Sequence, residues 1–264
     1  MSKNIVNRDD VRVFLALAKE MAGMPRWPAA AGGAPYEPSL KLQVNRTRRP
    51  IGRFASRKMN VHMPYVSSLE RDFCYLMETS PSVSAYLTQP GPLRYLHDDE
   101  VKTHLPDVLM LKGDRRLLLE VKYDDDAARE KVRRRTEWLT AALAPHGIAY
   151  RLVRESAIRI QPRLRWARLL SRFRWHEPHP QVLFLVEEFL RKHEAVPLRD
   201  IAMHLEIPPD SQFLSAHSDP KVEHIDTQTA LAAETALFAG VLRGHFRVRE
   251  WRDPLSASLI CLPQ

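Results

Sequence analysis

The chain is poor in cysteine and has no long apolar runs. Its two cysteines, Cys74 and Cys261, are far apart among 264 residues and lie in apolar sequence. They can form neither a disulfide framework nor a zinc site, which fits a reducing compartment. No apolar run approaches the length that spans a membrane. The first residues show no secretory pattern. We therefore expect a cytoplasmic protein with no membrane association.

Basic residues outnumber acidic ones, giving a formal net charge of +8. Such a balance favours a polyanionic partner such as double-stranded DNA, although it could also serve only solubility. Residues 41–60 hold no acidic residue. We predict a phosphate-contacting arm here, and a solvated basic loop is the alternative. The basic residues of the arm are Lys41, Arg46, Arg48, Arg49, Arg53, Arg57 and Lys58, and a second cluster comprises Lys131, Arg133, Arg134 and Arg135.

The stretch from His104 to Lys122 predicts a β-hairpin that gathers three charges. Two apolar runs flank the turn signal Lys-Gly-Asp-Arg at 112–115, as in buried strands. Asp107 precedes the first run, and Glu120 and Lys122 end the second. In an antiparallel pair, the start of one strand lies beside the end of the other. Residues two apart share a face. Two carboxylates and one ammonium should therefore converge.

Such a cluster suits a divalent metal. Two buried carboxylates repel each other, and one would take up a proton unless a cation lay between them. Mg²⁺, or Mn²⁺ in its place, binds carboxylate oxygens, lowers the pKa of a bound water and stabilises charge on a phosphate. Lys122 could hold the attacking water. Because an acidic-x-Lys triplet is common by chance, solvated strand-end charges remain the alternative.

A fourth candidate, Glu70, lies upstream. Apolar residues at 69, 73, 76 and 77 predict an amphipathic helix over 67–79 with Ser67 or Ser68 as its N-cap. Glu70 falls in its first turn, where it could also serve only to complement the helix dipole.

The remaining pattern predicts four segments. A helix and linker occupy 1–40, and the core that carries these charges occupies 41–155 together with the basic arm. In that core we expect strands at 83–88, 91–96, 105–111, 116–122 and 148–154 and a helix at 125–144. A linker rich in Arg and Pro follows at 156–180. The last segment, 181–264, should be a mostly helical, winged-helix-like domain for docking or DNA binding, with helices near 181–191 and 227–241 and a hairpin near the end.

Residues 46–122 resemble the TnsA endonuclease subunit of heteromeric cut-and-paste transposons. The resemblance rests on these pieces: Gly52-Arg-Phe-Ala-Ser56-Arg-Lys58, Tyr65-Val-Ser-Ser-Leu-Glu70-Arg-Asp-Phe73, Val83-Ser-Ala-Tyr-Leu-Thr-Gln89-Pro90, Leu105-Pro-Asp107 and Glu120-Val-Lys122. It covers about a third of the chain closely. Some members carry Gln where this chain has Glu120.

The resemblance implies an α/β fold with a PD-(D/E)xK restriction-endonuclease-like core, in which a mixed central sheet is flanked by helices. It assigns Glu70, Asp107 and Glu120 to Mg²⁺ or Mn²⁺ and Lys122 to the hydrolytic water. Gln89 joins Arg46, Arg48, Arg49, Arg53 and Lys58 as an expected DNA contact. The expected activity is 5′-end cleavage at transposon ends, beside a DDE-type transposase and an AAA+ ATPase regulator. A free-standing restriction-type nuclease and a non-catalytic DNA-binding adaptor are the alternatives.

Overall fold

The computed structural model describes residues 51–205 except 92, 98, 99 and 179, and also residues 235, 237–250, 252 and 258–263. The chain divides into two compact units, Met1–Arg159 and Ile160–Gln264, and each is described by itself. The predicted N-terminal helix and linker (1–40) and the arm residues Arg46, Arg48 and Arg49 lie outside the described residues. No helix in the described part is long and apolar enough to cross a membrane.

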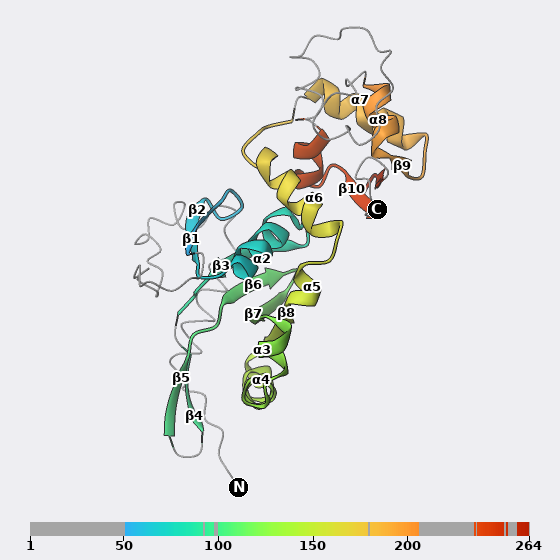
Figure 1. Cartoon of the computed structure of the whole chain (residues 1–264). Coiled ribbons are helices and arrows are strands. Elements are labelled where there is room, and N and C mark those ends of the chain that lie inside the picture. The colour runs from blue at the N-terminus through green and yellow to red at the C-terminus, as the bar shows by residue number, and fades with distance from the viewer. Residues whose placement is uncertain are drawn as a thin grey trace. The chain divides into compact units, whose positions relative to one another are not determined.

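The first unit is built on a four-stranded mixed sheet (Figure 1). The strands are β3 (Val83–Thr88), β6 (Val108–Lys112), β7 (Arg115–Lys122) and β8 (Ile148–Arg154), in the order β3-β6-β7-β8. The pairs β3–β6 and β6–β7 are antiparallel, and β7–β8 is parallel. These four strands confirm the sequence prediction to within a few residues, and with it the mixed α/β class.

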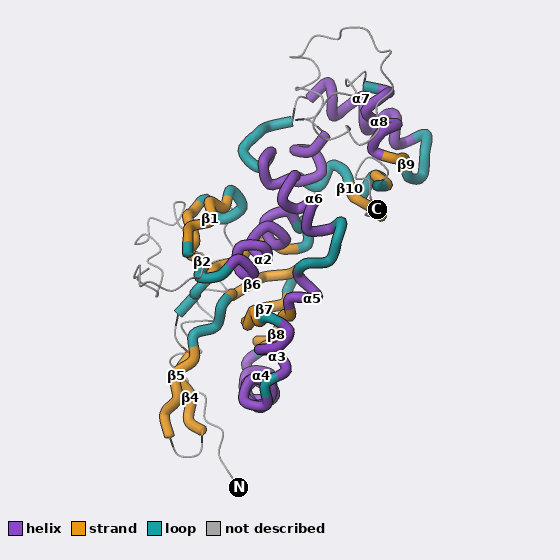
Figure 2. The backbone as a smooth tube through the Cα atoms, in the orientation of Figure 1, coloured by secondary structure: helices purple, strands orange, loops and turns teal. Residues whose placement is uncertain are grey.

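Helices flank both faces of this sheet (Figure 2). On one face, Leu69 of α2 (Ser68–Thr79) packs with Val121 of β7. On the other, Arg135 of α4 (Glu130–Leu143) reaches Glu120, and successive strand residues point to opposite faces. The apolar runs of β6 and β7 are buried because both of their faces are covered. Gly113 turns the hairpin with φ +56°, a conformation that favours glycine.

The prediction of a single helix over 125–144 is wrong in that the helix is interrupted. The structure has α3 (Asp124–Ala128) and α4, separated at Arg129, whose backbone is extended at φ −63° and ψ 132°. A further short helix, α5 (Glu155–Ile158), places Ile158 against Leu69 and Val121. The Arg159 side chain ion-pairs with the buried Asp72 of α2 at 3.0 Å, which fixes α5 to the unit.

Two antiparallel hairpins accompany the sheet. The first pairs β1 (Gly52–Ser56), which lies within the region predicted as a basic arm, with β2 (Val61–Tyr65), which follows that region. The second pairs β4 (Leu93–His97) with β5 (Glu100–His104) and leads directly into Asp107. Of these four strands only β4 was predicted. The others carry polar residues among short apolar ones and therefore give weak strand signals.

Glu78, a buried residue of α2, fastens the first hairpin to the core. Its Oε2 accepts hydrogen bonds from Ser56 Oγ at 2.6 Å and Tyr86 OH at 2.7 Å. Its Oε1 accepts the backbone N–H groups of Arg57 at 2.9 Å and Lys58 at 3.0 Å. Four donors from two segments, residues 56–58 and β3, meet on one carboxylate, so the hairpin is held against α2 and β3.

The structure gives Lys58 a structural role in place of the predicted DNA contact. Its Nζ donates to the carbonyl oxygens of Met77, Ser80 and Val83 at 2.7, 2.8 and 2.7 Å. An ammonium has three donors, and all three are used. Burial lowers the pKa of Lys58 to about 8, against the opposing attraction of Glu78. The charge also complements the C-terminal end of α2, which has no basic residue in its last turn.

The second unit has its own core. Its helices are α6 (Arg163–Leu170), α7 (Pro180–Arg191) and α8 (Leu198–His204), and residues 237–243 are also helical. A three-stranded sheet has the order β10-β11-β9, with β9 at Val196–Pro197, β10 at Arg247–Glu250 and β11 at Leu259–Cys261. The predicted C-terminal hairpin is thus confirmed. Residues 227–234 of the predicted third helix lie outside the described residues.

The segment predicted as a linker, 156–180, is largely folded. It holds α5, α6 and the short helix η3 (Ser171–Phe173), and the boundary between the units falls after Arg159. Trp166 of α6 is fully buried, and its Nε1 donates to Ser258 Oγ at 3.0 Å. The apolar residues of α6 are interspersed with arginines. The composition of this segment therefore suggested a linker, whereas the structure shows a helix packed in the core of the second unit.

We predict that Lys58→Met lowers the free energy of unfolding by roughly 2–4 kcal/mol, because it leaves three carbonyls without their donor and removes a positive charge that attracts Glu78. Chemical denaturation measures this. Arg53→Met, at an exposed position of the same hairpin, is the matched control and should change stability by less than about 0.5 kcal/mol. Unchanged stability in Lys58→Met, with weaker DNA binding, would restore Lys58 to the predicted DNA-contacting arm.

Candidate active site

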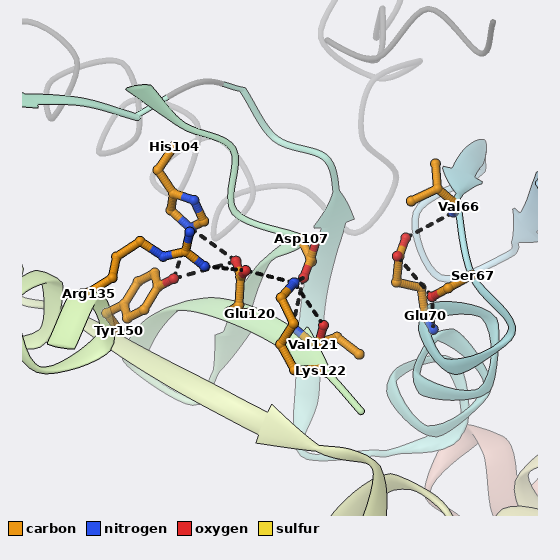
Figure 3. A network of polar contacts seen from close by, with 10 residues as sticks. All are labelled: Val66, Ser67, Glu70, His104, Asp107, Glu120, Val121, Lys122, Arg135 and Tyr150. Carbon is orange, nitrogen blue, oxygen red and sulfur yellow. Dashed lines mark hydrogen bonds and ion pairs between the residues drawn. The ribbon is translucent and has the colours of Figure 1, made fainter. Parts of the chain in front are cut away.

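Asp107, Glu120 and Lys122 converge where β6 begins and β7 ends (Figure 3). The Lys122 Nζ lies 2.7 Å from Glu120 Oε1 and 3.5 Å from Asp107 Oδ2. It also donates to the carbonyl oxygen of Val121 at 3.2 Å. One ammonium is thus surrounded by three oxygens from two strands, and the structure brings together three of the four predicted catalytic residues.

The backbone fixes Asp107 in this position. Its N–H donates to the Leu119 carbonyl at 3.0 Å, and its own carbonyl accepts from the Gln89 N–H at 2.9 Å. The Val121 N–H donates to Asp107 Oδ2 at 2.7 Å. Asp107 therefore bridges the ends of β3 and β7, and its carboxylate is aimed by the strand that carries Glu120 and Lys122.

Glu120 accepts from three further side chains that the sequence did not identify. The His104 Nε2 lies 3.0 Å from Oε2, and the Tyr150 OH lies 3.5 Å from the same atom. The Arg135 Nη2 lies 2.9 Å from Oε1. His104 and Tyr150 also contact each other, with 2.8 Å between Nε2 and OH. Sequence offered only weak signals: His104 stands three residues before Asp107, and Arg135 belongs to a basic cluster.

The pKa values of the two carboxylates are shifted in opposite directions. Burial, together with repulsion from Glu120, raises the pKa of Asp107 to about 7. Burial also acts to raise the pKa of Glu120, but the hydrogen bond and charge of His104, with Lys122, outweigh it and lower that pKa to about 2. The pKa of Lys122 is raised, since Asp107 and Glu120 outweigh the effect of its burial. Near neutral pH, Glu120 and Lys122 are therefore charged, and Asp107 lies near its midpoint.

Glu70 stays apart from the other three in its hydrogen bonding. Its Oε2 accepts from the Val66 N–H at 3.0 Å, and its Oε1 accepts from Ser67 Oγ at 2.9 Å. The Ser67 Oγ in turn accepts the Glu70 N–H at 3.1 Å, which closes a capping arrangement at the start of α2. Burial raises the pKa of Glu70, and Lys122 and Glu120 are close enough to influence it. Glu70 therefore takes part in capping the start of α2.

Two of the predicted DNA contacts differ in exposure. Arg53 is exposed on β1, where a phosphate could reach it. Gln89 is buried, with φ +49° at the end of β3. Its backbone positions Asp107, so its place in the structure does not resemble that of a surface contact.

The oxygens around Lys122 have the chemistry of a site for a hard cation. Asp107 and Glu120 could hold Mg²⁺ or Mn²⁺ through carboxylate oxygens, which these ions prefer. Within the described part of the chain, however, no three His, Cys, Asp or Glu side chains lie close enough to bind one ion. The structure therefore offers a cation the two carboxylates of Asp107 and Glu120, and it does not bring Glu70 to them as a third ligand.

We predict that Asp107→Asn stabilises the metal-free protein at alkaline pH. The pKa of this carboxyl is near its ordinary value of 3.8 in the unfolded chain and about 7 in the folded protein. The folded state therefore holds more protons between these values, and wild-type stability falls as pH rises through them. In EDTA, the variant should exceed wild type by roughly 1–3 kcal/mol above about pH 8, and the difference should close toward about pH 4. Asp114→Asn, in the exposed turn, should show no such trend in denaturation measured against pH.

Comparison with known proteins finds no family model that matches this chain and no match among curated proteins.

Proposed function

We propose that this protein is a divalent-metal-dependent DNA endonuclease with a PD-(D/E)xK core, acting as a TnsA-like subunit at transposon ends. The observation that carries the proposal is the convergence of the Asp107 and Glu120 carboxylates on Lys122 Nζ, where β6 begins and β7 ends. Burying charges of this kind costs free energy, so their presence suggests a functional role. A pKa displaced as far as that of Asp107 is typical of functional sites.

The residues have distinct tasks in hydrolysis, in which water adds to a phosphodiester and one P–O bond breaks. Asp107 and Glu120 would hold Mg²⁺, which supplies Lewis acidity toward the phosphate and makes a bound water more acidic. Lys122, kept protonated by both carboxylates, orients the attacking water or a phosphate oxygen through Nζ. His104 and Tyr150 hold Glu120 in place by binding Oε2, so Glu120 in turn keeps Lys122 in place.

The second unit is proposed as a winged-helix-like docking domain. The order of its elements supports this, because β9 lies between α7 and α8, and the β10–β11 hairpin follows the helical residues 237–243. Exposed apolar side chains occur on α7 and α8: Phe184 and Leu185 are about half exposed, and Met203 is 75% exposed. Such residues suit a protein partner better than a phosphate backbone. The proposed partners are the AAA+ ATPase regulator and the DDE-type transposase.

The TnsA assignment itself is supported by the motif resemblance, and the chemistry of the site would equally serve a free-standing restriction-type nuclease. Footprinting separates the two. A transposon-end subunit should show little intrinsic sequence preference, whereas one specific footprint of the isolated protein at physiological salt would favour the restriction enzyme. A DNA-binding adaptor would bind DNA without cutting it in Mg²⁺ or Mn²⁺.

We predict that Asp107→Ala abolishes cleavage while the fold is retained, because the variant removes a ligand and a repulsive charge together. Lys122→Ala should lose most of the activity yet bind Mn²⁺ as well as wild type or better, since a positive charge beside the cation is removed. Plasmid nicking and metal titration measure both. Asp114→Ala, on the exposed turn, is the control. Nicking by Asp107→Ala under conditions where wild type cuts would rule out this site.

We further predict that removing residues 160–264 leaves metal binding intact and abolishes capture of the partner ATPase. The boundary is placed after Arg159 because α6 contributes Trp166 and Leu170 to the second core. Pull-down of the ATPase with each unit measures the division. Capture by residues 1–159 alone, with none by 160–264, would contradict the docking assignment.

A further inference from the structure

The carboxylate of Glu120 is already fully engaged by the protein. Its Oε1 receives Lys122 Nζ at 2.7 Å and Arg135 Nη2 at 2.9 Å. Its Oε2 receives His104 Nε2 at 3.0 Å and Tyr150 OH at 3.5 Å. A carboxylate offers about four lone-pair sites. A cation can therefore bind Glu120 only if one of these four donors leaves.

Arg135 is the donor that is held least firmly. His104 and Tyr150 are buried and bound to each other, and Lys122 lies on the same strand as Glu120 and also contacts Asp107. The Arg135 side chain reaches across from α4 and is 26% exposed. Its Nε is buried, with no hydrogen-bond partner among the described residues. The guanidinium of this partly exposed side chain thus keeps one unused donor, Nε.

A DNA phosphate is the ligand that such a guanidinium fits. Arginine binds phosphate oxygens through two parallel N–H donors, whereas Arg135 has only one nitrogen, Nη2, on Glu120. The exchange would satisfy Nε and release Oε1 beside Asp107, the other carboxylate of the site.

We propose that Arg135 exchanges between Glu120 and a DNA phosphate and so makes cation binding at Glu120 depend on DNA. This inference rests on the proposed nuclease function. Without DNA, the guanidinium competes with the cation for Oε1. With DNA, the phosphate takes the guanidinium and Oε1 becomes a ligand. Because such coupling is reciprocal, bound cation also favours DNA binding, and the protein is kept from loading metal away from its substrate.

Mn²⁺ affinity without DNA tests the competition. Arg135→Met keeps most of the aliphatic stem and removes the donor, and it should bind Mn²⁺ about tenfold more tightly than wild type, within the usual range of coupling between sites. Arg134→Met is the matched control. Arg134 is the preceding residue of α4, is 78% exposed and pairs with Glu130 at 2.7 Å, so its loss should leave Mn²⁺ affinity unchanged. Free Mn²⁺ measured by electron paramagnetic resonance gives the affinities.

A double-mutant cycle separates direct competition from the repulsion of a nearby charge. In a Glu120→Gln background the contested carboxylate is absent, so Arg135→Met should no longer tighten Mn²⁺ binding. A second reading is duplex DNA binding in EDTA, where Arg135→Met should reduce the slope of log affinity against log salt by about 0.9, the loss of one phosphate contact. Arg135→Gln replaces the methionine variant if thermal unfolding shows that the latter does not fold.

The outcomes distinguish this inference from the function on which it rests. Equal Mn²⁺ affinities of wild type and Arg135→Met, or a tightening that persists in Glu120→Gln, overturn the exchange while Asp107-dependent Mn²⁺ binding still supports the nuclease site. Absence of Mn²⁺ binding in every protein, with and without duplex DNA, overturns the proposed function and the exchange with it.

Discussion

The pairing of β6 with β7 is the constraint on which the site depends. Its register sets Val108 opposite Leu119, so the residue before β6 meets the last residues of β7. Two hydrogen bonds then lock Asp107 to that strand, one through its backbone N–H to Leu119 and one through Oδ2 from Val121. A shift of one residue would turn Glu120 and Lys122 to the opposite face. The tight turn that pairs Lys112 with Arg115 prevents this shift.

Burial affects the two carboxylates differently because the charges around them do not balance evenly. Glu120 has His104, Arg135 and Lys122 around it and stays ionised. Among the described residues, Lys122 is the only basic side chain paired with Asp107, whose pKa is raised to about 7. In the proposed function, a cation bound to Asp107 would relieve the electrostatic cost of burying that carboxylate. The difference between the two carboxylates thus comes from their neighbours, and it assigns Asp107 the greater need for an external partner.

Lys58 and Lys122 show how partners decide the role of a lysine. Lys58 donates to three backbone carbonyls and is lowered in pKa to about 8, so it binds the hairpin to α2 and has no donor left. Lys122 contacts two carboxylates and is raised in pKa. The first arrangement is complete by itself and stabilises the fold. The second places oxygens of both carboxylates around the Lys122 ammonium.

The sequence alone determined the central strands, the convergence of Asp107, Glu120 and Lys122, and an N-cap at Ser67 or Ser68, of which the structure shows Ser67. These features are local: a four-residue turn joins β6 to β7, and alternation and capping act over a few residues. Only the tertiary structure placed Arg135 and Tyr150 on Glu120, joined Lys58 to the end of α2 and buried Trp166 of α6 in the second core. Such contacts join residues 15 to 92 positions apart. They depend on how helices pack against sheets and against one another, and no short-range pattern in the chain encodes that packing.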